Sequence, residues 1–276
     1  MIFGRQIELK IESPDGRIKV FQSGYENEND FHIEFTVEMG KNFSIKIYNV
    51  LRETYLMCEK KNREYAKIEL YAGYKEGVEP GLIASGQILD PIYSVSNTDR
   101  ILEIKGTFKA SDLYGRIQAQ SFYGLEVKTI IAMLLQKAGI EKYKINSTTF
   151  KTLNQYTSTG NLKNDLNNLS KLIDCIHYFS KGTLFIEPQE YKKLKSQYMV
   201  LLDRESGLIG SPEKKGAHLL VRSLLNPDLD KGEIFKLKYR DNAKDEIIES
   251  DCKILLGKHL CDLNNQFYTD MECIKV

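Results

Sequence analysis

The stretch that decides the fold runs from Gly207 to Leu237 and reads GLIGSPEKKGAHLLVRSLLNPDLDKGEIFKL. Two apolar runs, 219–221 and 234–237, stand on either side of a dense turn signal, Asn226-Pro227-Asp228. A proline fixes its own φ and pushes the residue before it out of the helical region. The stretch therefore predicts two strands joined by a shaped corner. It has one histidine, no cysteine and no paired carboxylates, so it is built to hold a shape.

The chain before this stretch alternates apolar and polar residues with the period of two that is typical of strands. Ser13-Pro14-Asp15-Gly16 is a strong turn signal, and a short helix is expected over 52–61 with Asn49 as its N-cap. Ser96-Asn97-Thr98-Asp99 predicts another turn. The expected strands cover 7–12, 18–20, 31–37, 43–47, 67–74, 82–92 and 100–107.

The composition shifts near Ser111, where helical spacing replaces alternation. Two amphipathic helices are expected over 125–138, ending at Gly139, and over 162–173. Between them, 146–160 predicts a loop with one short strand. A hairpin of 175–180 and 183–187 follows, and then a basic connector at 191–197. Strands resume over 199–202, 217–225, 233–239, 251–259 and 267–276, with a turn at 264–266.

These patterns predict a mainly β protein with an α/β insert, in which a small barrel or sandwich and a second β domain flank a middle α/β domain. The length of 276 residues allows two or three domains at roughly 100–200 residues each. We place an N-terminal β-barrel domain at 1–112, the middle domain at 113–195 and a C-terminal β-barrel domain at 196–276.

Composition excludes several classes of function. Lys and Arg number 39 against 38 Asp and Glu, which argues against a general binder of polyanions. A nearly neutral chain also has little electrostatic repulsion between its copies. The five cysteines are odd in number and irregular in spacing, so we expect no disulfide framework. The N-terminus shows no signal peptide, and no apolar run approaches the ~18 residues of a membrane span.

Candidate catalytic or metal-binding residues have simpler interpretations. Cys252, His259, Cys261 and Cys273 lack the close Cys-x-x-Cys pair of zinc sites and fit two neighbouring strands instead. Glu34 with Glu38, or Asp203 with Glu205, are candidate carboxylate pairs for glycan hydrolysis, but Glu34 and Glu38 alternate with apolar positions and so belong on a wet face.

The remaining candidates also favour structural roles. Ser206 and Ser211 form no nucleophile elbow, and His177 lies within a predicted strand. Lys192, Lys193 and Lys195 fit a solvated linker. We therefore expect no catalytic residue, no cofactor and no metal.

Several of these segments, taken in order, resemble the phage tail baseplate hub proteins of Mu-like and T-even-like tails, including late control protein D. The N-terminal match lies in 47–51, 68–74 with its Ala72-Gly73-Tyr74 ending, and 83–88. The helix at 125–139 and the hairpin strand 182–186 resemble the middle domain of that family. The Leu224-Leu225-Asn226-Pro227 corner resembles the start of its last barrel.

The resemblance implies a non-enzymatic structural protein of the virion tail, assembled in the host cytoplasm. Three copies would form a ring of pseudo-sixfold symmetry from two similar barrels each. The ring would join the tail tube protein to the spike and let DNA and the tape-measure protein pass. No sequence repeat links the two predicted barrels, so their likeness rests on analogy.

The residues leave two alternatives open. One is a tail-associated cell-wall hydrolase, and the other is the hub of a secretion or bacteriocin-like injection machine. The predicted pattern ends with the second barrel at Val276, where we expect no hydrolase or spike domain.

Overall fold

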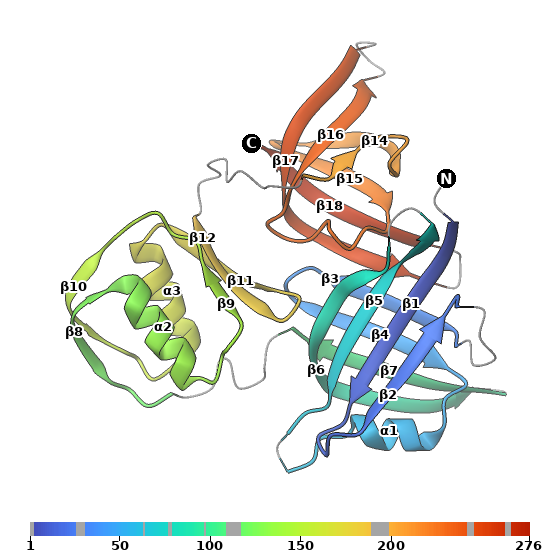
Figure 1. Cartoon of the computed structure of the whole chain (residues 1–276), viewed down its shortest axis with the longest axis horizontal. Helices are drawn as coiled ribbons and strands as arrows, with labels where there is room; N and C mark the ends of the chain where they lie inside the picture. Colours follow the sequence, from blue (N-terminus) through green and yellow to red (C-terminus); the bar gives the residue numbers. More distant parts are fainter. Residues whose placement is uncertain are drawn as a thin grey trace. The chain divides into compact units, whose positions relative to one another are not determined.

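The computed structural model describes residues 3–25, 31–62, 64–76, 79–96, 98–108, 117–188, 199–241, 246–262 and 266–276. The chain folds into two compact units (Figure 1). The first, here the β unit, combines Met1–Phe108 with Lys193–Val276. The second, here the middle unit, is Lys109–Lys192. The division into three domains at 112 and 195 stays a prediction.

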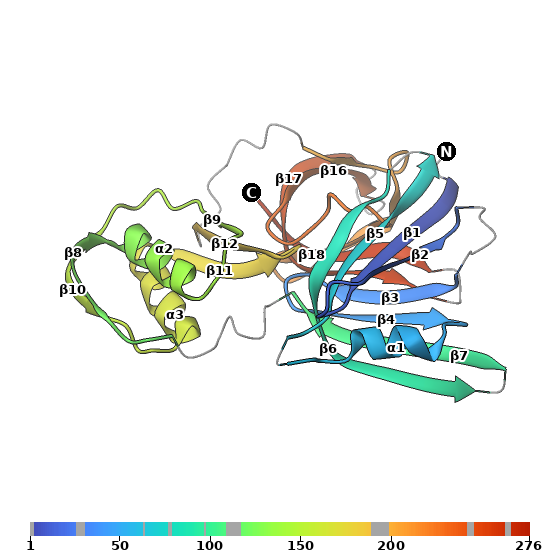
Figure 2. The same ribbon diagram turned by 60° about the horizontal axis from the view of Figure 1, so that its bottom comes forward.

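The β unit is built almost entirely from strands (Figure 2). Its first region contains β1 (Phe3–Glu12), β2 (Ile18–Ser23), β3 (Ile33–Glu38), β4 (Asn42–Tyr48), α1 (Arg52–Cys58), β5 (Lys67–Glu76), β6 (Gly81–Ser96) and β7 (Asp99–Thr107). Its second region contains β13 (Leu201–Leu202), β14 (Leu208–Lys215), β15 (His218–Leu224), β16 (Ile234–Asp241), β17 (Glu246–Cys261) and β18 (Phe267–Lys275).

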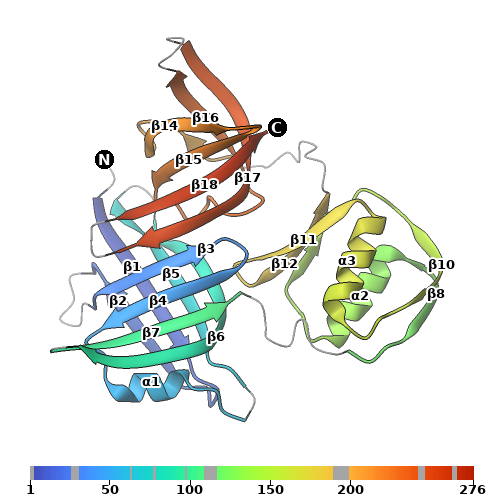
Figure 3. The same ribbon diagram turned by 180° about the vertical axis from the view of Figure 1, so that it is seen from behind.

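One sheet runs through both regions. Among the described residues its order is β14-β15-β18-β17-β3-β4-β7-β6-β5-β1-β2, with β16 pairing β17 and β13 pairing β16. Figure 3 shows β18, β17, β3, β4 and β7 side by side. The two regions meet where the second half of β17 pairs antiparallel with β3. We call this contact the β17–β3 joint, and it joins segments more than two hundred residues apart.

The two regions repeat one strand topology. The order β3-β4-β7-β6-β5 in the first matches β14-β15-β18-β17-β16 in the second. Both contain one long strand, β6 or β17, each of 16 residues. Both long strands also shift register against the following strand, between Ile88 and Asp90 in β6 and between Ile254 and Leu256 in β17. The likeness is structural and has no visible counterpart in the sequence.

Alternating burial explains why these segments form a sheet. In β3 the apolar residues Ile33, Phe35 and Val37 are buried while the intervening residues are half-buried, and β4 repeats the pattern. One face therefore packs inward and the other meets solvent, as the sequence predicted for this antiparallel sheet. The mainly β class is confirmed.

Several sequence predictions in the β unit were wrong in detail. Asn49 does not cap α1, because Leu51 is the N-cap residue and no side chain caps the helix. Asn49 instead takes a positive φ of 59° in the turn before the helix. The strand expected to end at Ile92 continues to Ser96, and β14 was not predicted because Gly210 and Pro212 read as loop. Residues 97, 191–197, 264 and 265, which fell in predicted turns and the basic connector, lie outside the described residues.

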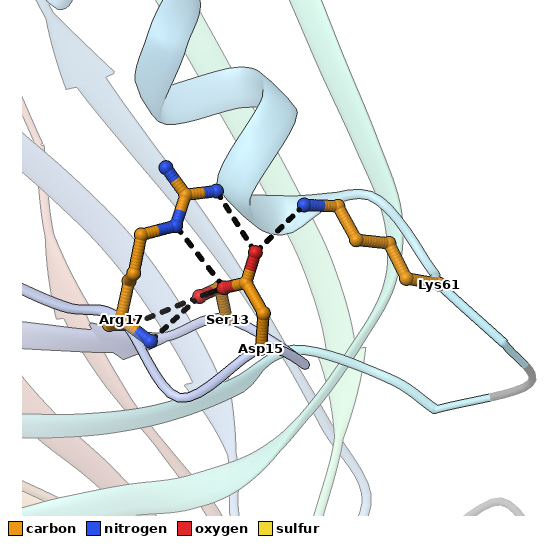
Figure 4. A network of polar contacts seen from close by, with 4 residues as sticks. All are labelled: Ser13, Asp15, Arg17 and Lys61. Carbon is orange, nitrogen blue, oxygen red and sulfur yellow. Dashed lines mark hydrogen bonds and ion pairs between the residues drawn. The ribbon is translucent and has the colours of Figure 1, made fainter.

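The β1–β2 turn forms the polar network shown in Figure 4. Asp15 lies between Arg17 and Lys61, with Arg17 Nε 3.1 Å from Oδ1 and Lys61 Nζ 3.0 Å from Oδ2. Ser13 also donates its hydroxyl to Asp15. The hydrogen bonds from Arg17 above all, then those from Ser13 and Lys61, hold the pKa of Asp15 below its usual range. The predicted turn is thus tied to the segment that follows α1.

Asp15→Asn should destabilise the protein at neutral pH, and it should destabilise it less at pH 3, which is below the unfolded-state pKa of the carboxyl. A carboxyl whose folded-state pKa is depressed contributes stability above its unfolded pKa of about 3.9, and this contribution fades as pH falls through the folded-state value. Urea unfolding of wild type and variant at pH 7 and pH 3 measures the difference. Glu246→Gln, at an exposed carboxylate beginning β17, is the control. An Asp15→Asn effect of equal size at both pH values contradicts the prediction.

The middle unit packs two helices with short strands. Its elements are β8 (Ser121–Glu126), α2 (Val127–Lys137), β9 (Tyr143–Ile145), β10 (Thr152–Thr157), α3 (Leu162–Leu172), β11 (Cys175–Ser180) and β12 (Thr183–Pro188). β8 pairs β10, and β11-β12-β9 form a small sheet. Both helices, the short strand within 146–160 and the β11–β12 hairpin were predicted. Residues 125–126 belong to β8 and not to the helix, and β9 was missed.

Local signals explain the helix ends. Gly139 follows α2 with a φ of 70° and donates its amide to Gln136, which suits a residue without Cβ. Asn161 caps α3 by accepting the Asn164 amide. None of the helices among the described residues is long and apolar enough to span a membrane.

Candidate assembly surfaces

The corner predicted at Asn226-Pro227 attaches the second region to the first. The side-chain Oδ1 of Asn226 accepts a hydrogen bond from the Asp228 backbone amide at 2.9 Å, and the backbone amide of Asn226 donates to Thr269 Oγ1 at 3.2 Å. Pro227 lies so close to Gly81 of β6 that a Cβ on this glycine would come within 2.8 Å of the proline ring. The turn signal therefore shapes an internal contact.

Phe267, at the start of β18, is the aromatic anchor of this contact. It is 3% exposed, and its ring meets Tyr74 edge-on at 5.1 Å and Phe35 at 6.3 Å. The Arg5 guanidinium lies 5.4 Å from the ring centroid. Tyr74 donates its hydroxyl to the Phe267 carbonyl, and burial raises the pKa of Tyr74 to about 12. Side chains from β1, β3 and β5 thus converge on one residue of the second region.

The outer face of the β17–β3 joint carries a row of alternating charges. Arg222, Asp270, Lys258 and Glu38 are register partners across four strands, and we call them the ion row. Arg222 binds Asp270 with two hydrogen bonds of 2.6 and 3.1 Å, and Lys258 Nζ lies 3.9 Å from Asp270. Opposite charges directly across neighbouring strands stabilise the pairing.

A pocket of about 720 Å³ lies over the ion row. Two exposed apolar side chains, Ile209 and Leu256, line it together with charged residues that include Lys41 and Glu213. Glu272, also on its wall, has its pKa lowered mainly by the hydrogen bond from His218. A pocket lined by both apolar and charged side chains has the composition of a protein contact surface.

Two strand edges of the β unit have no second ladder partner among the described residues. The only ladder partner of β14 among the described residues is β15, and the only one of residues 90–96 in β6 is β7. Ile92 is 41% exposed and Val95 65% exposed. Open edges with exposed apolar side chains are templates for pairing with another chain.

The four residues weighed as a metal site lie on the neighbouring strands β17 and β18. Cys252 and Cys273 belong to the core of the second region. His259 is buried with its Nδ1 3.0 Å from Thr269 Oγ1. Burial raises the pKa of all three cysteine thiols, that of Cys261 to about 12, which disfavours the thiolate that a metal requires. No described group of three or more His, Cys, Asp or Glu residues could hold a metal ion.

The carboxylates considered for glycoside hydrolysis are arranged for other tasks. Glu34 and Glu38 lie four residues apart on β3, which is ~13 Å along a strand and beyond the ~5–9.5 Å that a glycosidase pair needs. Asp203 accepts hydrogen bonds from the backbone amides of Ser206 and Glu205 and from the Ser206 hydroxyl. These bonds, above all those from Ser206, lower the pKa of Asp203. A general acid needs the opposite shift.

The other candidates follow their structural interpretations. The Ser206 hydroxyl is engaged in the Asp203 turn, and Ser211 lies on β14 at the pocket. His177 pairs with Ile186 within the β11–β12 hairpin. Sequence reasoning missed Phe267 and the open edge of β6. The alternation of Tyr93 and Val95 with Ser94 and Ser96 could have extended that strand.

Sequence comparison finds neither a family model nor a curated protein that matches the chain. Comparison of folds, in contrast, finds clear neighbours. A tail protein from Neisseria meningitidis MC58 matches with a TM-score of 0.66 at 9% identity, over 98% of this chain and 96% of that one. The 43 kDa tail protein of prophage MuSo2 from Shewanella oneidensis matches with a TM-score of 0.63 at 12% identity, over 98% of each chain.

A third neighbour comes from a secretion machine. It is an E. coli component of the type VI secretion system that is itself structurally similar to the T4 tail proteins gp27 and gp5. It matches with a TM-score of 0.56 at 11% identity, over 91% of this chain and 76% of that one. At these identities the likeness concerns the fold. The chain has the fold shared by these phage tail proteins and this type VI secretion component.

Proposed function

We propose that the protein is a structural hub of a phage tail or a related injection machine. Its copies form a threefold ring of pseudo-sixfold symmetry that joins the tail tube to the spike. The ring passes DNA and the tape-measure protein, and its place is the tail of the assembled particle. The three proteins of similar fold support a place in a phage tail or a secretion machine. The residues weighed for catalysis favour a structural role over a hydrolase.

The repeated strand order is the observation that carries the proposal. A ring with sixfold features can be made from three chains only if each chain supplies two similar parts. The matching orders β3-β4-β7-β6-β5 and β14-β15-β18-β17-β16 are two such parts in one chain.

Each of the two regions closes as a small barrel in this proposal. In the first region the Phe31 amide donates to the Gln22 carbonyl, which brings β2 to the segment that enters β3. In the second, Leu208 of β14 bonds the Asp203 carbonyl just after β13, around a buried core that includes Phe235 and Leu237. Closure removes edges that would otherwise pair at random.

The near-neutral charge of the chain suits a channel for DNA. A wall lined with cations would retain the phosphate backbone, since each contact adds affinity. We therefore expect the lumen of the ring to carry no continuous stripe of Lys and Arg, and a basic pore in the structure of the assembled ring would contradict this.

Negative-stain electron microscopy and native mass measurement of the purified protein test the proposal. The expected result is a ring with threefold symmetry and the mass of three chains. A cell-wall turbidity assay on the same preparation separates the hub from a hydrolase. A preparation that stays monomeric at high concentration overturns the hub, and one that also clears cell walls favours the hydrolase.

A further inference from the structure

The internal repeat extends to individual residues of the sheet. Reading across neighbouring strands, the first region places Thr36, Ser44, Lys105 and Asp90 in one row. The second region places Glu213, Leu220, Glu272 and Leu256 in the corresponding row. Each row contains the first paired residue after the register shift of its long strand, Asp90 in β6 and Leu256 in β17. From there on, β6 and β17 can be aligned residue by residue. Leu260 of β17 then corresponds to Ser94 of β6.

This alignment shows that one contact of the repeat is made within the chain, while its equivalent is not made among the described residues. Residues 258–261 of β17 pair with β3 at the β17–β3 joint, where Leu260 lies opposite Thr36. The equivalent residues of β6 are 92–95, whose described ladder partner is β7 alone. The equivalent of β3 is β14, whose described ladder partner is β15 alone. The two halves of a second joint are therefore present, separate and exposed.

The side chains of the two open edges suit each other. In the first region Glu103 is the register partner of both Lys46 and Ile92. In the second region Asp270 is in the same way the register partner of both Arg222 and Lys258. Glu38 completes the ion row at the β17–β3 joint, and its equivalent on β14 is Lys215. A lysine at this place would lie in the same row as Glu103, next to the exposed Ile92. Opposite charges and apolar contact across strands both favour pairing.

The open edge of β14 is also protected against unselective pairing. Pro212 cannot donate to a ladder, Gly210 has a φ of 71°, and the strand shifts register between Ile209 and Glu213. Bulges, prolines and lysines are the devices by which edge strands avoid aggregation. Only the short run 213–215 remains regular, which limits what can dock there.

We propose that residues 92–94 of β6 in one copy pair antiparallel with residues 213–215 of β14 in the next copy, with Ser94 opposite Glu213. The partner is a second copy because the joint it reproduces is one that the chain already makes with itself. Successive copies would then meet head to tail through two different surfaces, an arrangement that forms a ring when the rotation between copies closes after three chains. This inference rests on the proposed function, because it specifies the contact between copies of the ring.

Cysteine cross-linking tests the pairing. Residues directly opposite on antiparallel strands have Cα atoms ~4.5–5.5 Å apart, within the range that a disulfide spans. Ser94 and Glu213 are exposed, and all five natural cysteines are buried. We expect Ser94→Cys protein and Glu213→Cys protein to stay monomeric on non-reducing gels when oxidised separately, and to give a linked dimer when mixed. The double variant should give bands that end at three chains.

Lys214→Cys provides the matched control, because a shift of one residue turns the side chain to the other face of the sheet. Its cross-linking to Ser94→Cys should be at least about tenfold weaker than that of Glu213→Cys. Equal cross-linking of both variants, or none in the mixture, overturns the pairing. If wild type forms threefold rings but the Ser94–Glu213 link is absent, the strand pairing fails and the hub stands. If wild type forms no ring, the hub itself fails.

Discussion

Replacing Phe267 with alanine should lower the free energy of unfolding by about 3–5 kcal/mol, the range for a buried aromatic side chain. The ring is 3% exposed and is the meeting point of Arg5, Phe35 and Tyr74. Its loss leaves a cavity between the two regions of the β unit. The regions should then unfold less cooperatively, with a broader transition in urea followed by far-ultraviolet circular dichroism.

Two control variants test whether the effect comes from the buried Phe267 ring. Phe267→Leu keeps most of the volume and should cost well under half as much. Phe150→Ala removes a ring that is 76% exposed and packs against Lys128, so it should cost about 1 kcal/mol or less. If Phe267→Ala costs no more than Phe150→Ala, Phe267 is not the anchor between the regions.

Gly106→Ala should destabilise the protein by about 3 kcal/mol, the upper end of the range for overpacking a core. A Cβ at this position would overlap the Phe43 ring and the Gln87 carbonyl, and one of these obstacles is backbone that cannot rotate away. Gly86 faces the same ring, with its would-be Cβ 2.9 Å from Phe43 Cε1. Phe43 therefore lies over two glycines that neighbouring strands provide for it.

A double-mutant cycle with Phe43→Ala checks the cause. Removing the ring relieves one of the two overlaps, so the double variant should be less destabilised than the sum of the single variants by at least about 1 kcal/mol. Thermal or urea unfolding of the four proteins supplies the numbers. Strict additivity would mean that the Phe43 ring is not what the new methyl group meets.

The strands and helices with strong periodicity could be predicted from sequence. Alternation placed β1, β3, β4 and β5, and helical spacing placed α2 and α3, because in each case one face is buried and the other is wet. The turn chemistry of Asn226-Pro227 was also informative. Its role as an internal contact was not predictable, because Gly81 and Phe267 come from distant segments.

The assembly surfaces were harder to predict for a physical reason. Register and strand order are set by packing between distant segments, and a sequence pattern only shows that a strand has two faces. The β17–β3 joint and the ion row depend on pairing Lys258 with Glu38, which no local signal announces. β14 combines a bulge, a proline and charges, so the features that protect an edge also hide it from pattern reading.

Tethering two like regions in one polypeptide has a consequence for dilution. The β17–β3 joint is intramolecular, so its effective concentration does not fall when the protein is diluted. In a closed ring of three such chains, half of the contacts between regions persist at any concentration, and only the other half obey mass action. At equilibrium the concentration of the ring then scales with the third power of the concentration of free chain. A ring made of six separate pieces would scale with the sixth power of the concentration of free pieces.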